Sequence, residues 1–108
     1  MVENFHRFDI VLVKLNPTVG SEIQKTRPCI VISPDEMQAL HTVIVAPMTS
    51  KGFHFIFRPH ITFDGTEGLV LLDQIRAVDK KRIVKRLGRI EEKTARSVAT
   101  LLQEMFRY

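Results

Sequence analysis

The sequence predicts a mainly β protein with short helices, built as a small, strongly bent antiparallel sheet or barrel with a C-terminal helix. Its apolar runs are short, rich in β-branched residues and separated by Pro and Gly, which is typical of strands and turns. Only the last segment, residues 91–106, repeats its apolar residues at helical spacing. The chain has 108 residues, which suits a single domain over residues 1–108 and is too short for two.

The first half of the chain contains three apolar runs, which predict strands over residues 9–15, 28–33 and 42–47. The loop over residues 16–27 is longer than a tight hairpin needs, and long loops in compact domains are often functional. Pro34 and the acidic residues after it predict a short helix that ends near His41. We expect the third strand to stop at Pro47, because proline has no amide hydrogen to donate.

The second half continues the β pattern. Phe53, Phe55 and Phe57 alternate with other residues at the period of a strand, although three such rings are also suited to stacking on unpaired bases. Further strands are expected over residues 61–63, 68–75 and 83–88, with a turn at 64–65, and residues 77–79 are expected to end the long strand region. The final helix has one apolar face, which is formed by Ala95, Val98, Leu101, Leu102 and Met105.

The composition excludes several classes of protein. With 44% hydrophobic and 26% charged residues, the chain is too apolar to be largely disordered. It has no apolar run long enough for a transmembrane helix, and its first residues do not resemble a signal peptide. Cys29 is the only cysteine, and the four histidines do not follow a metal-binding pattern. We therefore expect a cytoplasmic protein without a metal or another cofactor.

The net charge of +4 is distributed unevenly along the chain. Residues 1–73 hold 6 Lys and Arg against 8 Asp and Glu, a net charge of −2. Residues 74–108 hold 10 against 4, a net charge of +6. Residues 76–89 carry seven cations and one anion, Asp79. Such a basic stretch in a folded domain indicates a polyanionic partner, and a solvated face is the simpler alternative.

Polar residues at the expected strand ends are candidates for a site. Arg27 begins a strand just before Pro28, and its guanidinium can hold a phosphodiester in a bidentate way or pair with a structural carboxylate. Thr49 follows a strand and can donate to a phosphate oxygen or bond its own backbone. Asp73 and Gln74 end another strand and point to opposite faces.

Together these segments resemble the MazF/PemK/Kid family of toxins from toxin–antitoxin modules. The resemblance rests on four motifs in order, within residues 16–22, 27–34, 45–50 and 70–76. It implies an SH3-like, CcdB/MazF-type barrel that forms a homodimer. It also implies a metal-independent endoribonuclease, which cuts single-stranded mRNA at a short sequence and thereby inhibits translation and growth. A cognate antitoxin with an acidic C-terminal tail is the expected protein partner.

The family's main catalytic residues correspond to Arg27 and Thr49 in this chain, and its loop glutamate corresponds to Glu22. Some members carry a histidine where this chain has Ser21 and an arginine where it has Leu71, so a mechanism that uses those two groups does not transfer. The chain is more similar to the subgroup that relies on Arg27 and Thr49. We expect further RNA contacts from Ser21, Ser50, Lys51, Phe53, Gln74, Arg76 and Arg86.

Metal-free RNA cleavage needs a base for the 2′-OH, stabilisation of the phosphorane and a proton for the 5′-oxygen. Arg27 is expected to stabilise the phosphorane, and Thr49 to align the scissile phosphate. Either Glu22 or Asp73 accepts the 2′-OH proton, and the sequence does not choose between them. The expected products are a 2′,3′-cyclic phosphate and a 5′-OH.

Two other classes share parts of the pattern. CcdB-like gyrase-binding toxins have a related fold but carry a C-terminal Trp, and this chain has no Trp. A non-catalytic RNA-binding barrel would keep the basic stretch but would have no reason to hold Arg27 and Thr49 together with the loop of residues 20–22.

Overall fold

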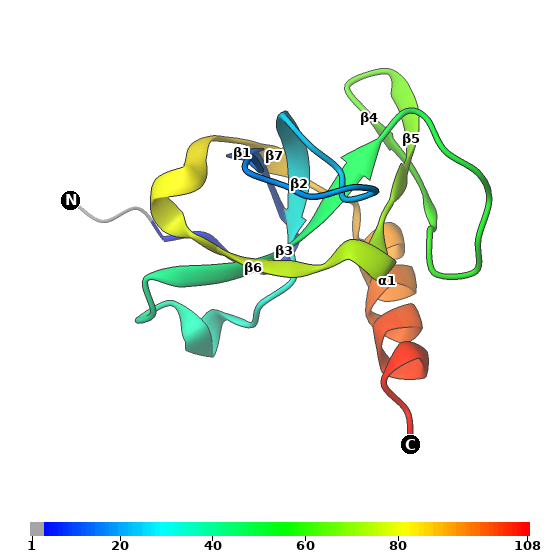
Figure 1. The fold of residues 1–108 in the computed structure, drawn as a ribbon. Coiled ribbons are helices and arrows are strands. Elements are labelled where there is room, and N and C mark those ends of the chain that lie inside the picture. Colours follow the sequence, from blue (N-terminus) through cyan, green and yellow to red (C-terminus); the bar gives the residue numbers. More distant parts are fainter. Residues whose placement is uncertain (1–3) are drawn as a thin grey trace.

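The fold is a curled antiparallel sheet with one C-terminal helix, seen in a computed structural model that describes residues 4–108 (Figure 1). Its strands are β1 (Asp9–Lys14), β2 (Thr26–Val31), β3 (Thr42–Thr49), β4 (His60–Phe63), β5 (Thr66–Val70), β6 (Arg76–Asp79) and β7 (Ile83–Arg89). They follow the order β4-β5-β3-β2-β1-β7, and β6 also pairs with β3. The predicted mainly β class and the C-terminal helix, α1 (Glu92–Met105), are therefore confirmed.

Strand β3 is the centre of the sheet because it pairs with three others. Along one edge it pairs with β2, with Cys29 opposite Pro47. Along the other edge its first half pairs with β6 and its last two residues, Met48 and Thr49, pair with β5. The expected stop at Pro47 is wrong: the strand runs on to Thr49, since the Pro47 carbonyl still accepts a hydrogen bond of 2.8 Å from the Leu71 amide.

The predicted long strand over 68–75 is also wrong, because the chain leaves the sheet after Val70. A single 3-10 turn, η2 (Leu72–Gln74), separates β5 from β6. This turn lets the two strands pair with successive parts of β3. It also places Asp73 and Gln74 on a surface turn, where their side chains reach loops instead of the sheet face.

The alternating phenylalanines do not form the predicted strand, and residues 53–59 are an irregular loop. Phe53 and Phe55 are exposed, whereas Phe57 packs against the core. Alternation alone misled here because the segment forms no regular ladder. The Arg58 amide bonds locally to the Phe55 carbonyl at 2.9 Å, and the Phe57 and Pro59 carbonyls accept single bonds from Leu72 and Val70. The predicted helix after Pro34 is a single 3-10 turn, η1 (Asp35–Met37).

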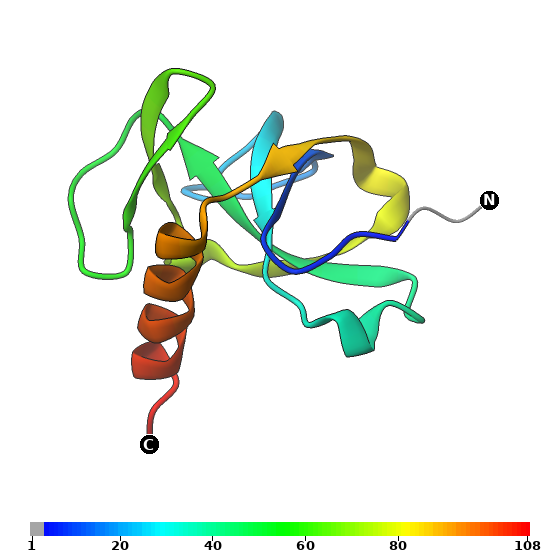
Figure 2. The ribbon, with the colours of Figure 1, turned by 180° about the vertical axis from the view of Figure 1, so that it is seen from behind.

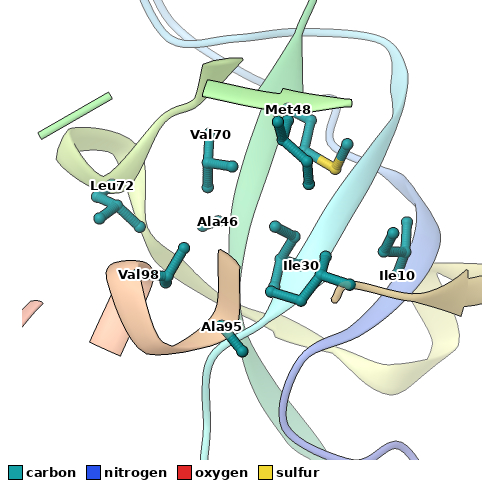
Figure 3. Packing of buried hydrophobic residues seen from close by; sticks show 10 residues of the cluster. Ile10, Ile30, Ala46, Met48, Val70, Leu72, Ala95 and Val98 are labelled. Carbon is teal, nitrogen blue, oxygen red and sulfur yellow. The ribbon is translucent and has the colours of Figure 1, made fainter. Parts of the chain in front are cut away.

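Two groups of buried side chains stabilise the sheet. One group lies under α1, where Ala95 and Val98 face Ala46 and Ile30 (Figure 3). The second group gathers β-branched residues of β1, β2, β3 and β6 around Val13 on the other side of the sheet. Helix α1 and the β4–β5 hairpin stand on the same side of the molecule in both views (Figures 1 and 2). In the described part, no helix is long and apolar enough to cross a membrane.

Candidate nucleic-acid interface

An open groove of about 690 Å³ lies between the end of β3, the start of β2 and the β4–β5 hairpin. Arg27 and Thr49 both line it, although they come from different strands. Its floor is apolar and includes Met48, Ile61 and Leu87. The groove thus combines a cation and a hydroxyl with an apolar floor, which suits a phosphodiester flanked by bases.

Arg27 is held at the rim of the groove by the strand and by its own loop. It lies opposite Val13 in the β1–β2 ladder, and it is partly exposed. Its Nε donates a hydrogen bond of 3.1 Å to the carbonyl of Gln24. This contact restricts the side chain and leaves the two terminal amino groups of the guanidinium outside that bond. The predicted alternative, a pairing with a structural carboxylate, is not among the ion pairs of residues 4–108.

Thr49 ends β3 at the point where β5 passes closest. Its hydroxyl accepts a hydrogen bond of 3.1 Å from the Lys51 amide, so the predicted backbone contact does form. A hydroxyl that accepts through one lone pair can still donate its hydrogen to an anion. Ser50 also lines the groove, whereas Lys51 is exposed on the adjoining loop.

Gln74 fixes the loop that carries Ser21 and Glu22. Its side-chain oxygen accepts a 2.7 Å bond from the Ile23 amide, and its nitrogen lies 3.5 Å from the Ser21 carbonyl. The Glu22 carboxylate accepts a hydrogen bond from the Val19 amide within the same loop. None of these three predicted residues lines the groove itself. Instead, the Gln74 side chain connects η2 to the loop before Arg27, which carries Ser21 and Glu22.

Asp73 forms a bidentate ion pair with Arg58. Arg58 Nε lies 2.9 Å from one carboxylate oxygen and Nη2 lies 2.8 Å from the other. The hydrogen bonds from Arg58 hold the pKa of Asp73 below its usual value, although partial burial acts in the opposite direction. A carboxylate with a lowered pKa, with both oxygens bound to one guanidinium, is a weak base. Arg58 was not among the residues predicted for the site.

Most of the basic stretch holds the fold together. Arg76 donates to the Leu15 carbonyl, Lys80 to the Gln38 carbonyl and Arg82 to the Lys14 carbonyl, at 3.2, 2.6 and 3.3 Å. These bonds tie the segment after η2 to the end of β1 and to the loop that follows η1. The cations still contribute a positive field, but their side chains have structural partners, so direct RNA contacts by Arg76 remain an expectation.

Arg86 and Arg89 lie beside Asp9, which is only 2% exposed. Arg86 Nη2 lies 3.2 Å and Arg89 Nη1 3.4 Å from the same oxygen of Asp9. Burial alone would raise the pKa of Asp9, but the bonds from Arg86, the His6 amide and Arg89 outweigh it and lower the pKa. Arg86 therefore has a structural role, and its contact with RNA stays a prediction.

Sequence reasoning missed the contribution of the β4–β5 hairpin. Phe63, Asp64, Thr66 and Glu67 line the groove opposite Arg27 and Thr49. Their turn was predicted, but the pairing of β5 with the end of β3 was not, and this pairing brings the hairpin to the groove. Among residues 4–108, no three His, Cys, Asp or Glu side chains lie together as metal ligands would.

The curled sheet, the C-terminal helix and the open polar groove define a small barrel of the MazF kind. A structure of MazF (Form-I) from Deinococcus radiodurans superposes with a TM-score of 0.85 at 22% identity and covers 99% of this chain and 100% of that one. A MazE–MazF structure (Form-II) from the same organism has a TM-score of 0.78 at 19% identity, with 98% of each chain covered. The predicted barrel type is confirmed.

The chain belongs to the family of PemK-like, MazF-like toxins of type II toxin–antitoxin systems, whose model matches residues 6–106. It is 38% identical over 96 residues to endoribonuclease PemK of Escherichia coli, covering 82% of this chain and 72% of PemK. It is 33% identical over 106 residues to the endoribonuclease toxin ChpB of Escherichia coli K12, covering 92% of this chain and 91% of ChpB. The resemblance seen in the sequence is thus confirmed.

Proposed function

We propose that this protein is an endoribonuclease toxin that cuts single-stranded mRNA at a short sequence without a metal ion and so inhibits translation and growth. The observation that carries the proposal is the groove that brings the Arg27 guanidinium and the Thr49 hydroxyl together. The endoribonuclease names of its relatives support RNA cleavage and favour it over the CcdB-like alternative.

Arg27 stabilises the charge that develops on the phosphorane. A guanidinium stays protonated at any physiological pH, so it serves better as an electrostatic stabiliser than as a proton donor. The bond to the Gln24 carbonyl orients it before substrate binds, and this lowers the cost of reorganisation during the reaction. Thr49 donates its hydroxyl hydrogen to a non-bridging oxygen and aligns the phosphate for in-line attack by the 2′-oxygen.

Glu22 is the carboxylate that we assign to the proton of the 2′-OH, although it lies outside the groove, on the loop that leads into Arg27. Of the two predicted candidates, Asp73 is occupied by Arg58, whereas Glu22 is exposed and accepts a single backbone bond. The tether between Gln74 and Ile23 restricts the loop that carries Glu22 and leads into Arg27. After proton removal, the 2′-oxygen attacks phosphorus and the 5′-oxygen leaves with a proton, which yields a 2′,3′-cyclic phosphate and a 5′-OH.

The proposal includes the partners and the setting of a toxin. We infer that the chain forms a homodimer in the cytoplasm and binds a cognate antitoxin whose acidic tail covers the groove. Structures of the same fold support the antitoxin, since one is a MazE–MazF structure and another is an endoribonuclease in complex with its cognate antitoxin. Light scattering of the pure protein would test the dimer, and co-purification with the antitoxin would test the complex.

The decisive experiment incubates the purified protein with a long RNA in the presence of EDTA and maps the ends of the fragments. Cleavage at a recurring short sequence, with 2′,3′-cyclic phosphate and 5′-OH ends, is expected. Arg96→Ala is the matched control, because Arg96 lies on the exposed face of α1 and, among residues 4–108, forms an ion pair with Glu92 alone. Cleavage that EDTA abolishes, or 5′-phosphate ends, would refute the mechanism. RNA binding without cleavage would favour the non-catalytic RNA-binding barrel. Inhibition of DNA supercoiling by gyrase would favour the CcdB-like toxin.

A further inference from the structure

The loop of residues 50–59 is anchored to the rest of the protein by an ion pair between side chains and by backbone bonds from Leu72 and Val70 to the Phe57 and Pro59 carbonyls. The Arg58 side chain is only 14% exposed and its partner Asp73 31%, and the pair forms two parallel hydrogen bonds. A bidentate pair of this kind fixes the plane of the guanidinium as well as its position. Phe57, next to Arg58, packs on the core, so both residues hold the end of the loop against the body of the protein.

The same guanidinium also supports an exposed aromatic ring. Arg58 Cζ lies 4.8 Å from the centre of the Phe53 ring, which is the geometry of a cation–π contact. Phe53 is nevertheless 69% exposed. A large apolar ring that is held by a fixed cation yet open to solvent is suited to stacking against a flat ligand.

The residue before Phe53 lies beside the groove. A Cβ built at Gly52 would lie 3.7 Å from Arg58 Nη1 and 3.9 Å from Thr49 Cγ2. Gly52 is therefore close to both the guanidinium and the groove threonine, and Phe53 follows it directly in the chain. A base next to a phosphate at Thr49 is thus within reach of the Phe53 ring.

We propose that Phe53 is a stacking surface for one unpaired base beside the scissile phosphate, and that Asp73 and Arg58 are positioning residues that hold it there. The inference rests on the proposed ribonuclease function and assigns the Asp73 carboxylate to substrate selection instead of proton transfer. Base–aromatic stacking tolerates every base but differs in strength among them, so loss of the ring changes both affinity and the choice of cleavage site.

A tryptophan introduced at position 53 gives a direct probe of stacking, because the natural chain contains none. Phe53→Trp is titrated with an RNA oligonucleotide that contains the cleavage sequence. A 2′-deoxy nucleotide at the scissile position removes the attacking hydroxyl, so this oligonucleotide cannot be cut. We expect the indole fluorescence to be quenched on binding. Phe55→Trp is the matched control on the same loop, since Phe55 packs edge-on against Phe57 at 6.1 Å. Equal quenching in both variants, or none at position 53, would overturn the proposal.

The role of the ion pair is tested by Asp73→Asn, with Asp73→Glu as the variant that keeps the charge. Because stacking contributes about 1–3 kcal/mol per base, Asp73→Asn is expected to raise KM about 5- to 150-fold and to redistribute the cleavage sites. When it is combined with Phe53→Trp, the quenching of the indole by RNA should be weaker than in Phe53→Trp alone. Asp73→Glu, which keeps the charge, should change KM, the cleavage sites and the quenching less than Asp73→Asn does. Arg58→Lys, which keeps the charge but loses the fork, should behave like Asp73→Asn.

The outcomes separate this proposal from the proposed function. If the natural protein does not cut RNA, the function itself is wrong. If it cuts RNA and folded Asp73→Asn cuts the same sites with the same KM, the positioning role is wrong. A uniform fall in kcat, with unchanged KM and sites, would make Asp73 a proton acceptor and would also overturn the proposal. Thermal unfolding of each variant shows whether it is folded, and the fluorescence titration of Phe53→Trp measures stacking without depending on catalysis.

Discussion

Gly68 lies directly against the carbonyl of Thr49. A Cβ at position 68 would come within 2.6 Å of the Thr49 oxygen and 3.3 Å of its carbonyl carbon. Non-bonded atoms do not approach so closely, and the contact is with backbone that cannot rotate away. The absence of a side chain at Gly68 therefore lets β5 pair with the end of β3, where both strands line the groove.

Gly68→Ala is accordingly expected to lower both stability and RNA cleavage. Forcing a methyl group into this contact should cost about 1–3 kcal/mol, as overpacking commonly does. Urea unfolding and cleavage assays measure the two effects. Gly88→Ala is the matched control, since its Cβ would meet only the Phe63 ring, at 3.4 Å. Equal losses of stability and of cleavage rate in the two variants would show that the contact at Thr49 is unimportant.

Arg27→Ala should reduce the rate of RNA cleavage by about 10²–10³ without unfolding the protein, as loss of one stabilising donor commonly does. Arg27 is partly exposed and its side-chain bond is to a loop carbonyl, so its removal should leave the fold intact. Single-turnover kinetics on a mapped site provide the measurement. Arg27→Lys should recover only part of the activity, because lysine lacks the planar fork. An Arg27→Ala protein with natural activity would remove Arg27 from the mechanism.

Glu22→Gln is expected to lower kcat with little change in KM, because the amide cannot accept the 2′-OH proton. The amide oxygen can still accept the Val19 amide hydrogen, so the loop should persist. Glu67→Gln is the matched control, a carboxylate that lines the groove but is not assigned to proton transfer. An unchanged kcat in Glu22→Gln together with a lowered kcat in Glu67→Gln would transfer the role of base to Glu67.

Asp9 should make the stability of the fold depend on pH. Its pKa is lower in the folded protein than the ordinary value of 3.8, because the bonds from Arg86, His6 and Arg89 outweigh the effect of burial. A lowered folded pKa means that the stabilisation is fully present above the unfolded pKa and is lost as pH falls through the folded pKa. The free energy of unfolding in urea should therefore fall below about pH 4.

Asp9→Asn should be less stable than the natural protein at pH 7 by about 1.5–3 kcal/mol, the usual value of a hydrogen bond to a charged group. The difference in the free energy of unfolding between Asp9→Asn and the natural protein should become smaller in acid. Asp35→Asn is the control, because that carboxylate is exposed and its bonds lie on the surface. A constant difference between Asp9→Asn and the natural protein from pH 7 to pH 3 would contradict this account.

Cys29 should be unreactive in the folded protein. Burial raises the pKa of its thiol to about 12, although Arg76 acts in the opposite direction. The side chain is 0% exposed. Since the thiolate is the reactive form, a disulfide reagent at pH 8 should modify one thiol per chain in urea and almost none in its absence. Rapid reaction without denaturant would show that the strand opens readily.

Several features of the site could be predicted because they depend on short stretches of sequence. Arg27 before Pro28 and Thr49 after an apolar run each mark a strand end, and the family resemblance joined them into one site. The pairing of Asp73 with Arg58 could not be foreseen, since fifteen positions separate them and either residue could have met many other charges. The Phe53–Phe57 stripe misled because period-two alternation predicts a strand only where a partner strand supplies hydrogen bonds.

By itself the sequence determined the mainly β class, the single C-terminal helix, the family and the two residues proposed to act on the phosphate. Those conclusions follow from local patterns of apolar residues and from motifs that stay together along the chain. Only the tertiary structure decided which charges line the groove and which support the fold. Ion pairs such as Asp9–Arg86 and Asp73–Arg58 form between distant segments, and the curvature of the sheet determines which of those segments meet.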